Sequence, residues 1–382
     1  MFGTVRAMTA HAMDVPLLRL GFGEEETALL GEVLRSGMLI QGPRVAAFED
    51  AVRARTGRKH AIAVSNGTAA LELALEVLGV GPGDEVIVPN VTWPSAGNAA
   101  LRRGATVVLV DVDAHEWNAR PEVFAAARTA RTKAAVAIDQ FGSPARMPEI
   151  VAALPGVAVI EDAACAIGST LGGRAAGSFG AVACLSFHPR KVVTTGEGGM
   201  CLTDDDAMAE RLRTLRNHGQ RTPTNFTEAG PNERLPELSA ALGTLQLGRL
   251  DAMLEARRAQ ARRYASELPM LAFQQTAPGA MTNHQTLGAL LPEGTTAAAR
   301  DAFLDRLRAL GIGTGFLSYA LHRLPQFGPA ADSARAARRA FPNSESVVDR
   351  GFALPCFPGL TDIEQAHVVA SVRRALDGID SP

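Results

Sequence analysis

One lysine stands out for the chemistry that it could do. Lys191 ends the segment Ser186-Phe-His-Pro-Arg-Lys191 and is followed by a glycine-rich turn at 192–199. It is one of only three lysines in a chain of 382 residues that contains thirty-five arginines. Arginine cannot replace lysine where a neutral amine attacks a carbonyl, because the guanidinium stays protonated. The segment therefore predicts a lysine that forms a Schiff base.

A second segment, Ser65-Asn66-Gly67-Thr68, joins a predicted strand to a predicted helix. Gly67 lets the backbone approach an anion closely, and Thr68 offers a hydroxyl group. The following helix would point free N–H groups at the same ligand. The segment could hold a phosphate, although taken alone an ordinary helix cap is the commoner role for such residues.

Two further side chains follow predicted strands. Asp162 could keep a cationic ring nitrogen protonated through a charge-assisted hydrogen bond, whereas a lone acid there is usually a cap or a metal ligand. Trp93 could stack on a flat ring, although core packing is the commoner fate of a tryptophan.

The elements that must position these residues read as an α/β fold. Short apolar runs predict seven strands at 61–64, 85–88, 106–110, 134–138, 157–160, 181–187 and 199–202. Most are separated by helix-length segments, which is typical of a mainly parallel sheet covered by helices on both faces. One such helix is predicted at 67–78. Open α/β sheets bind ligands at the carboxyl ends of their strands, where the residues above fall.

The pattern of predicted helices and strands changes after Asn232. Residues 236–268 predict a long helical stretch, and 297–310 and 362–376 predict helices in a second mixture of helices and strands. We therefore expect a large domain of residues 1–250 and a smaller C-terminal α+β domain of residues 251–382.

Composition excludes several classes of partner. A net charge of −2 and a pI near 6.5 give no attraction to nucleic acid or to acidic lipid. The four cysteines are scattered, and no basic-then-apolar leader precedes Leu20. No apolar run reaches the roughly eighteen residues that cross a bilayer. We expect a cytoplasmic protein without a membrane, nucleic-acid or metal partner.

Together these residues supply every contact that one cofactor, pyridoxal 5'-phosphate (PLP), requires. Lys191 would react with its aldehyde, Asp162 would face its pyridine nitrogen, and Trp93 would cover its ring. Its phosphate would lie against Gly67, Thr68 and Ser186.

A series of motifs then carries a family resemblance. In chain order they are Ser36-Gly37, Gln41-Gly42-Pro43, Phe48-Glu49, SNGTAAL at 65–71, GPGDEVIVP at 81–89, EDAA at 161–164, SFHPRKVVTTGEGGM at 186–200 and LRNHG at 215–219, with weaker echoes at Leu321-His322 and 354–358. The chain resembles the DegT family, the sugar-aminotransferase branch of the fold-type-I PLP enzymes. The resemblance implies an aspartate-aminotransferase-like large domain.

The resemblance also implies roles for individual residues. Lys191 would anchor PLP and then act as the general base, and Asp162 would partner the pyridine nitrogen. Cys165 falls where the family usually has Gln or His beside the ring hydroxyl. Asn232 matches an asparagine that reaches the phosphate site of the neighbouring subunit, which implies a homodimer with shared active sites.

The activity that the resemblance implies is amino transfer by a ping-pong mechanism. L-glutamate or glutamine would donate the amino group, leaving pyridoxamine 5'-phosphate, and a keto sugar on a nucleoside diphosphate would accept it. Alternatives in the same family are a cyclitol or aminobenzoate-type enzyme and a sugar dehydratase. A PLP-binding regulator without turnover is an alternative of another class, although no DNA-binding segment is visible.

Several positions depart from the family pattern or have two interpretations. Asp139 replaces the usual His and could alter the substrate pocket or form a local ion pair; we favour the ion pair. Glu233 and Pro236 replace the usual residues near Asn232. His188 and His322 could contact substrate, although a structural role is at least as common for each.

Overall fold

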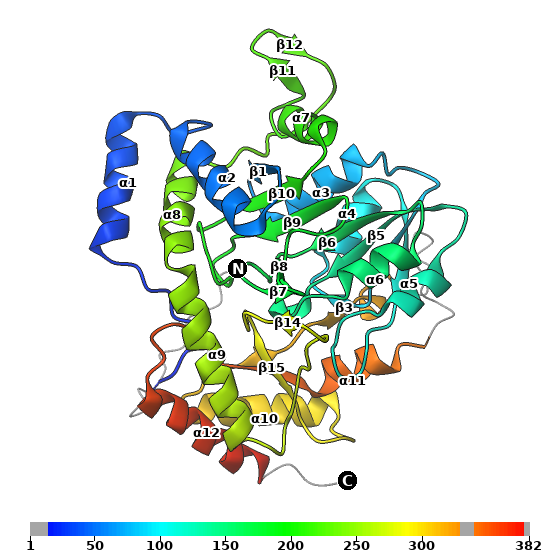
Figure 1. The fold of residues 1–382 in the computed structure, drawn as a ribbon. Coiled ribbons are helices and arrows are strands. Elements are labelled where there is room, and N and C mark those ends of the chain that lie inside the picture. The colour runs from blue at the N-terminus through cyan, green and yellow to red at the C-terminus, as the bar shows by residue number, and fades with distance from the viewer. Residues whose placement is uncertain (1–13, 329–339, 378–382) are drawn as a thin grey trace.

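The computed structural model describes residues 14–328 and 340–377, and a seven-stranded sheet dominates it (Figure 1). Its strands are β1 (His60–Val64), β2 (Glu85–Pro89), β4 (Thr106–Val110), β5 (Thr132–Ile138), β6 (Ala158–Asp162), β9 (Val182–Ser186) and β10 (Gly199–Thr203). They lie in the order β1-β10-β9-β6-β5-β2-β4. The run from β9 to β4 is parallel, and β10 is antiparallel to both of its neighbours. The predicted mainly parallel seven-stranded sheet is confirmed.

Helices cover both faces of this sheet, as predicted. One face packs against α3 (Gly67–Val77), α4 (Ser95–Arg102) and α7 (Asp206–Leu215). The other packs against α2 (Pro43–Thr56), α5 (Pro121–Ala127), α6 (Met147–Ala153) and α8 (Glu237–Gly248). Because both faces are covered, the strands are apolar and almost wholly buried, as parallel strands usually are.

The last residues of β6 point alternately to the two faces of the sheet. Ile160 packs in the core beneath α3, and Val159 packs in the core beneath α5 and α6. Successive side chains of a strand point to opposite faces. Asp162 therefore lies on the α3 face, and Glu161 lies on the opposite face.

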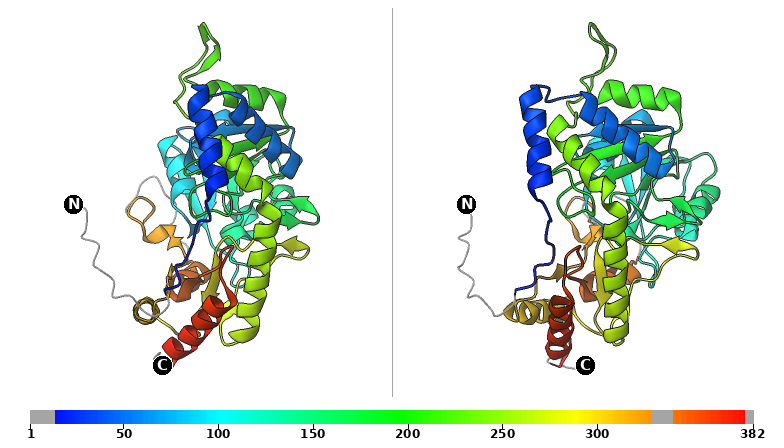
Figure 2. Two further views of the ribbon diagram at one scale, coloured as in Figure 1. Left: turned by 90° about the vertical axis from the view of Figure 1, so that its left-hand side faces the viewer. Right: turned by 60° about the vertical axis from the view of Figure 1, so that its left-hand side comes forward.

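The C-terminal part of the chain forms a second layer. A four-stranded antiparallel sheet contains β13 (Ala272–Phe273), β15 (Leu287–Leu290), β18 (Gly351–Leu354) and β16 (Gly315–Phe316). Three helices share its apolar core: α9 (Leu250–Glu267), α10 (Ala297–Ala309) and α12 (Asp362–Leu376). Helix α11 (Pro342–Arg350) precedes β18, and α1 (Glu24–Ser36) runs alongside α8 (Figure 2).

Short elements complete the described chain. Strand β3 (Val91–Thr92) pairs with β17 (Tyr319–Ala320), and β7 (Thr170–Leu171) pairs with β8 (Arg174–Ala175) and β14 (Ala280–Met281). Two single 3-10 turns occupy Gln140–Gly142 and Leu321–Arg323. A hairpin of β11 (Gln220–Thr222) and β12 (Asn225–Phe226) projects from the body of the protein (Figure 1).

The helix predicted at 236–268 is two helices. Helices α8 and α9 adjoin at Arg249, whose backbone closes the first and opens the second. The division into domains at residue 250 stays a prediction. Among the described residues, no helix is long and apolar enough to cross a membrane.

Candidate active site

Lys191 lies in the turn that connects β9 to β10. The turn folds on itself, because the Lys191 N–H donates to the carbonyl of His188 at 2.8 Å. The Lys191 side chain is half-buried, and its Nζ lies 3.1 Å from Sγ of Cys165. The lysine therefore presents its amine at the carboxyl end of the sheet.

Asp162 ends β6 and shares the electrostatic environment of that amine. Its carboxylate is buried and accepts a hydrogen bond from the Ala164 N–H at 3.1 Å. Burial raises the pKa of Asp162, and the positive charge of Lys191 opposes part of that increase. The structure thus brings together the amine and the acid that the sequence singled out.

The start of α3 meets the end of β9. A Cβ added at Gly67 would lie 2.8 Å from Cβ of Ser186, so only glycine fits without a shift. Asn66 caps the helix, its side chain accepting from the Ala69 N–H at 2.9 Å. Thr68 follows in the first turn and is half-buried. The cap and the close approach coexist, which leaves a helix N-terminus next to a serine hydroxyl.

Trp93 follows β3 and lies outside the core. Its side chain is 62% exposed, so the core-packing alternative is wrong. The indole meets Tyr319 edge to face, with ring centroids 5.5 Å apart, and Tyr319 meets Phe316 at 5.0 Å. The sequence interpretation missed these two aromatic residues, because they come from a part of the chain with weak motifs.

Two amides from the C-terminal part support the site, and no motif signalled them. Asn283 donates from Nδ2 to the carbonyls of Cys165 and Ile167, at 2.8 and 2.9 Å. Gln285 donates from Nε2 to the carbonyl of Arg190 at 2.8 Å. These amides connect the backbone beside Cys165 with the backbone next to Lys191.

The two candidate histidines have different surroundings. His188 is half-exposed, its Nδ1 accepts from the Arg190 N–H at 3.1 Å, and burial lowers its pKa. His322 stacks on Phe341 with centroids 4.9 Å apart, and its Nδ1 lies 2.8 Å from the amide of Asn90. Burial is also the largest cause of its lowered pKa. These contacts agree with the structural role considered for His322.

Asn232 is exposed on this chain and forms a backbone bridge with Asn217. Its neighbour Glu233 is hydrogen-bonded through its side chain to the hydroxyl of Ser65, and its carbonyl accepts from the Ser65 N–H at 2.9 Å. The loop therefore passes the segment that leads into Gly67.

The ion pair expected for Asp139 is wrong. We expected a local ion pair, but the side chain is fully buried and its charged neighbours are two other acids, Glu161 and Asp162. A carboxyl group among acids is not an ion pair, because like charges repel.

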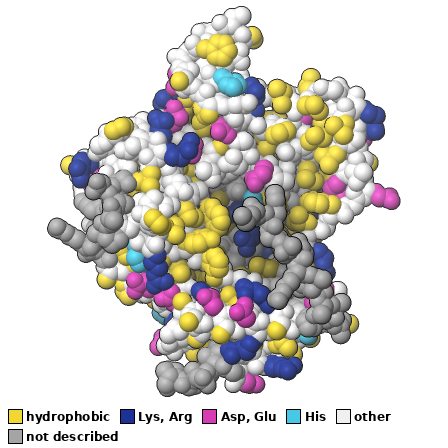
Figure 3. All heavy atoms as spheres, turned by 180° about the vertical axis from the view of Figure 1, so that it is seen from behind, with side chains coloured by type: hydrophobic (Ala, Val, Ile, Leu, Met, Phe, Trp, Pro, Cys, Tyr) yellow, Lys and Arg dark blue, Asp and Glu magenta, His cyan; other side chains and the backbone are white. Residues whose placement is uncertain are grey.

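Figure 3 shows one face of the molecule with a hollow near its centre. Hydrophobic side chains gather along one edge of the hollow, and a basic side chain is visible inside it. Mixed apolar and charged lining of this kind is usual in small-molecule sites.

Residues 21–373 match the sequence profile of the DegT/DnrJ/EryC1/StrS aminotransferase family. The chain belongs to this family. It is similar to the aminotransferase TlmJ from Streptoalloteichus hindustanus, with 32% identity, a TM-score of 0.89, and 96% of this chain and 100% of that chain covered. DesV from S. venezuelae, solved in complex with a ketimine intermediate, is 33% identical with a TM-score of 0.87, covering 93% of this chain and 95% of its own.

A third similar structure widens the chemistry within the DegT family. 3-Amino-5-hydroxybenzoic acid (AHBA) synthase is 32% identical with a TM-score of 0.87, and the match covers 94% of this chain and 96% of that chain. The predicted family and fold class are confirmed, and the protein is a PLP-dependent aminotransferase. Its substrates are small molecules.

The residues at the strand ends fit PLP on the geometry of this chain. The close approach of Gly67 to Ser186 leaves no room for a Cβ, so the backbone N–H groups at the start of α3 lie beside the Ser186 hydroxyl, where an anionic phosphate would bind. Asp162 supplies a buried acid, and Lys191 supplies an amine on the same side of the sheet.

Proposed function

We propose that this DegT family member transfers an amino group from L-glutamate or glutamine to a keto sugar carried on a nucleoside diphosphate. The observation that carries the proposal is the position of the Lys191 amine, 3.1 Å from Sγ of Cys165, which lies three residues after the buried acid Asp162. Dehydratases of this branch tend to have His where Lys191 stands, so the lysine favours amino transfer.

Each residue has a distinct proposed role. Lys191 would anchor PLP and then carry the proton between the donor carbon and the cofactor carbon through Nζ. Asp162 would hold a proton on the pyridine nitrogen, and Trp93 would cover the ring. Bound PLP would supply an electron sink for the charge left when the proton is removed. The phosphate would lie among Gly67, Thr68 and Ser186, and Cys165 would lie near the ring hydroxyl.

The reaction would alternate between two forms of the enzyme. The amino-acid donor would leave as a 2-oxo acid before the keto sugar enters, with the amino group held meanwhile as pyridoxamine phosphate. His188 is half-exposed next to the Lys191 turn and is our candidate for a substrate contact. His322 is a weaker candidate, because its ring already contacts Asn90 and Phe341.

We propose that the functional unit is a homodimer. The segment after α1 exposes Met38, Leu39 and Ile40, and Phe226, the last residue of β12 in the projecting hairpin, is 61% exposed. Consecutive exposed apolar side chains, such as Met38, Leu39 and Ile40, favour a protein interface. Asn232 would then complete the phosphate site of the partner. We also expect a cytoplasmic location and a domain division near residue 250.

An aminobenzoate-type substrate is the second candidate. AHBA synthase is as similar to this chain as the aminotransferase TlmJ is, with 32% identity for each. The aromatic group of Trp93, Tyr319 and Phe316 would suit a planar carbocycle as well as a nucleotide base.

The first test of the main proposal is the absorption spectrum of the protein. Purified protein loaded with PLP should be yellow, and its absorption band should disappear on addition of L-glutamate. Lys191→Ala should lose both the band and turnover, whereas Lys133→Ala, which changes an exposed lysine on β5, should keep both. A Lys191→Ala protein that still turns over would contradict the assignment.

Formation of 2-oxo acid then separates the candidate substrates. Product with nucleotide keto sugars, and not with free cyclic ketones, supports the sugar assignment. The reverse pattern supports the aminobenzoate-type alternative. Binding of PLP without any product would favour a regulator.

A further inference from the structure

Two acids are buried side by side behind Asp162. Asp139 and Glu161 are both 0% exposed. Glu161 pairs in parallel register with Ala137 of β5, and Asp139 follows the end of that strand. The Asp139 N–H donates to the carbonyl of Asp162 at 3.1 Å. The two carboxyl groups therefore lie at the ends of adjacent strands, on the face opposite the Asp162 side chain.

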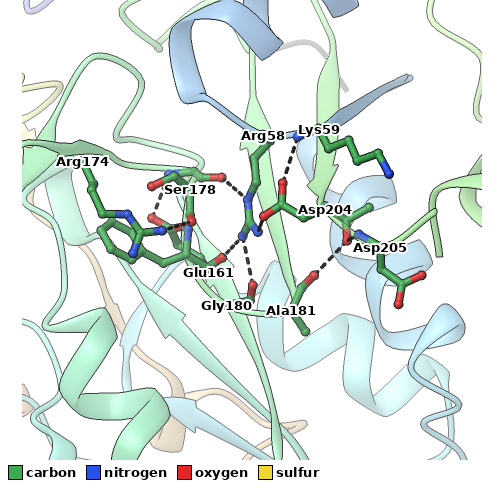
Figure 4. Close-up of polar contacts among 12 residues, drawn as sticks. Arg58, Lys59, Glu161, Arg174, Ser178, Gly180, Ala181, Asp204 and Asp205 are labelled. Carbon is green, nitrogen blue, oxygen red and sulfur yellow. Dashed lines mark hydrogen bonds and ion pairs between the residues drawn. The ribbon is translucent and has the colours of Figure 1, made fainter. Parts of the chain in front are cut away.

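Glu161 is held as an acceptor. Its Oε1 accepts from the Gly177 N–H at 2.8 Å, and its Oε2 accepts from the Phe179 N–H at 2.7 Å. Arg58 binds the same segment from the other side, donating to the carbonyls of Gly177 and Gly180 at 3.1 and 3.0 Å (Figure 4). Burial raises the pKa of Glu161, whereas the two N–H donors and the guanidinium of Arg58 act in the opposite direction and favour its ionised form.

Asp139 has the opposite surroundings. Its Oδ1 accepts from the Ala145 N–H at 2.8 Å, whereas its buried Oδ2 receives no hydrogen from any donor in the described part of the chain. Its carboxyl group lies next to that of Glu161, and the two groups interact electrostatically. Two ionised carboxylates cannot share a buried contact, but one proton between them satisfies both.

Burial, followed by the charge of Glu161, raises the pKa of Asp139 well above its usual range. The charged and titratable groups that act on the pair or border it are Asp162, Arg58, Cys184 and, through Asp162, Lys191. Arg58 favours ionised Glu161, whereas the charged groups with the largest effect on Asp139 are the acids Glu161 and Asp162. The shared proton therefore stays on Asp139.

We propose that Asp139 is a neutral carboxylic acid that donates its proton to Glu161, and that this one-proton pair positions Asp162. The pair ties the end of β5 to the end of β6 and, through Glu161, to the 177–180 segment. Asp162 follows Glu161 in β6, so the contacts of Glu161 and Asp139 on the opposite face of the sheet fix the backbone position of Asp162. Asp139 is thus a positioning residue, and this part of the inference rests on the proposed function of Asp162.

The protonated acid has a direct spectroscopic test that needs no cofactor. At neutral pH, the infrared difference spectrum between wild type and Asp139→Asn should contain the carbonyl band of a protonated carboxylic acid. Asp50→Asn, at a carboxylate that is 70% exposed, is the control and should give only carboxylate bands. A spectrum for Asp139→Asn with carboxylate bands alone would overturn the proposal.

Unfolding of the cofactor-free protein gives an independent test. Above pH 3.8, the usual pKa of Asp, the unfolded chain loses a proton that folded Asp139 keeps, so stability falls as pH rises. Asparagine cannot ionise and can still donate to Glu161. The unfolding constant of wild type relative to Asp139→Asn should therefore rise by about tenfold per pH unit until folded Asp139 ionises. A ratio that does not change with pH would contradict the pair.

The positioning role is tested by PLP titration. Asp139→Asn should bind PLP like wild type, and Asp139→Ala, which loses the contact to Glu161, should bind about tenfold more weakly. Equal binding by both folded variants would overturn the positioning role. If wild type itself bound no PLP, the proposed function would be wrong. The infrared and unfolding results would still show whether Asp139 is protonated.

Discussion

The amine of Lys191 lies 3.1 Å from the thiol of Cys165. The two residues come from different connections, one after β6 and the other between β9 and β10. Among the four cysteines, Cys165 alone is not fully buried. A half-buried thiol next to the proposed Schiff-base lysine is a position in the site that a thiol reagent can modify.

Thiol labelling should therefore be confined to one position. In folded, cofactor-free protein, iodoacetamide should modify Cys165 and leave Cys184, Cys201 and Cys356 unmodified, because those three are buried. Bound PLP should slow the reaction. Mass spectrometry of the labelled peptides checks this, with Cys165→Ser as the control that should remain unlabelled. Labelling of a buried cysteine at a similar rate would contradict the packing.

Gly67→Ala should weaken PLP binding. The new Cβ would lie 2.8 Å from Cβ of Ser186, so the end of β9 or the start of α3 must move. We expect the Kd for PLP to rise at least about tenfold, which corresponds to roughly 1.4 kcal/mol. Fluorescence titration measures it. Gly248→Ala is the matched control, because no atom lies within 4 Å of its added Cβ. Unchanged affinity in Gly67→Ala would argue against a phosphate cradle there.

Glu237 should be important for stability. Its buried carboxylate accepts three backbone N–H groups, from Gly42, Arg44 and Val45, each at 2.8 Å. Glu237→Gln replaces one of the two carboxylate oxygens with an NH₂ group, which is a donor and would face a backbone N–H that is also a donor. We expect a loss of about 1–3 kcal/mol in the free energy of unfolding, measured by urea titration. Glu255→Gln, on the exposed side of α9, should change it little.

Acid should destabilise the protein through His284. Burial, with Arg258 and Arg257 nearby, lowers the pKa of His284 from 6.5 to about 4. Between these values the unfolded chain binds a proton that the folded chain does not, so stability falls as pH falls. His284→Asn suits the positive φ of 48° and does not titrate there.

The Tm of His284→Asn minus that of wild type should therefore increase as pH falls from 6.5 toward 4. His115→Asn, at an exposed histidine, is the comparison and should show no such trend. A constant difference for His284→Asn across that window would mean that the folded histidine titrates normally.

Local sequence signals predicted the framework well. Each of the seven predicted strands overlaps a strand of the large sheet, because β-branched apolar runs bounded by turns are local features. The helix start at Gly67 was also predicted, since a capping residue precedes it. The break at Arg249 was missed, because the surrounding residues all favour helix.

Contacts between distant segments were not predictable in the same way. Asn283 reaches the carbonyl of Cys165 only because the C-terminal part packs against the large sheet. Asp139 meets Glu161 because of the register of β5 on β6, which a single sequence does not display. The ion pair expected for Asp139 was wrong for that reason.

The antiparallel strand β10 has a consequence for how the protein is made. Within residues 14–328 and 340–377, strand β1 pairs with β10 alone in the large sheet, and β10 ends at Thr203. On the ribosome, β1 and the Asn66–Gly67 corner must wait unpaired until more than half of the chain has been synthesised. The proposed phosphate cradle and the lysine turn would therefore take shape at nearly the same moment of synthesis.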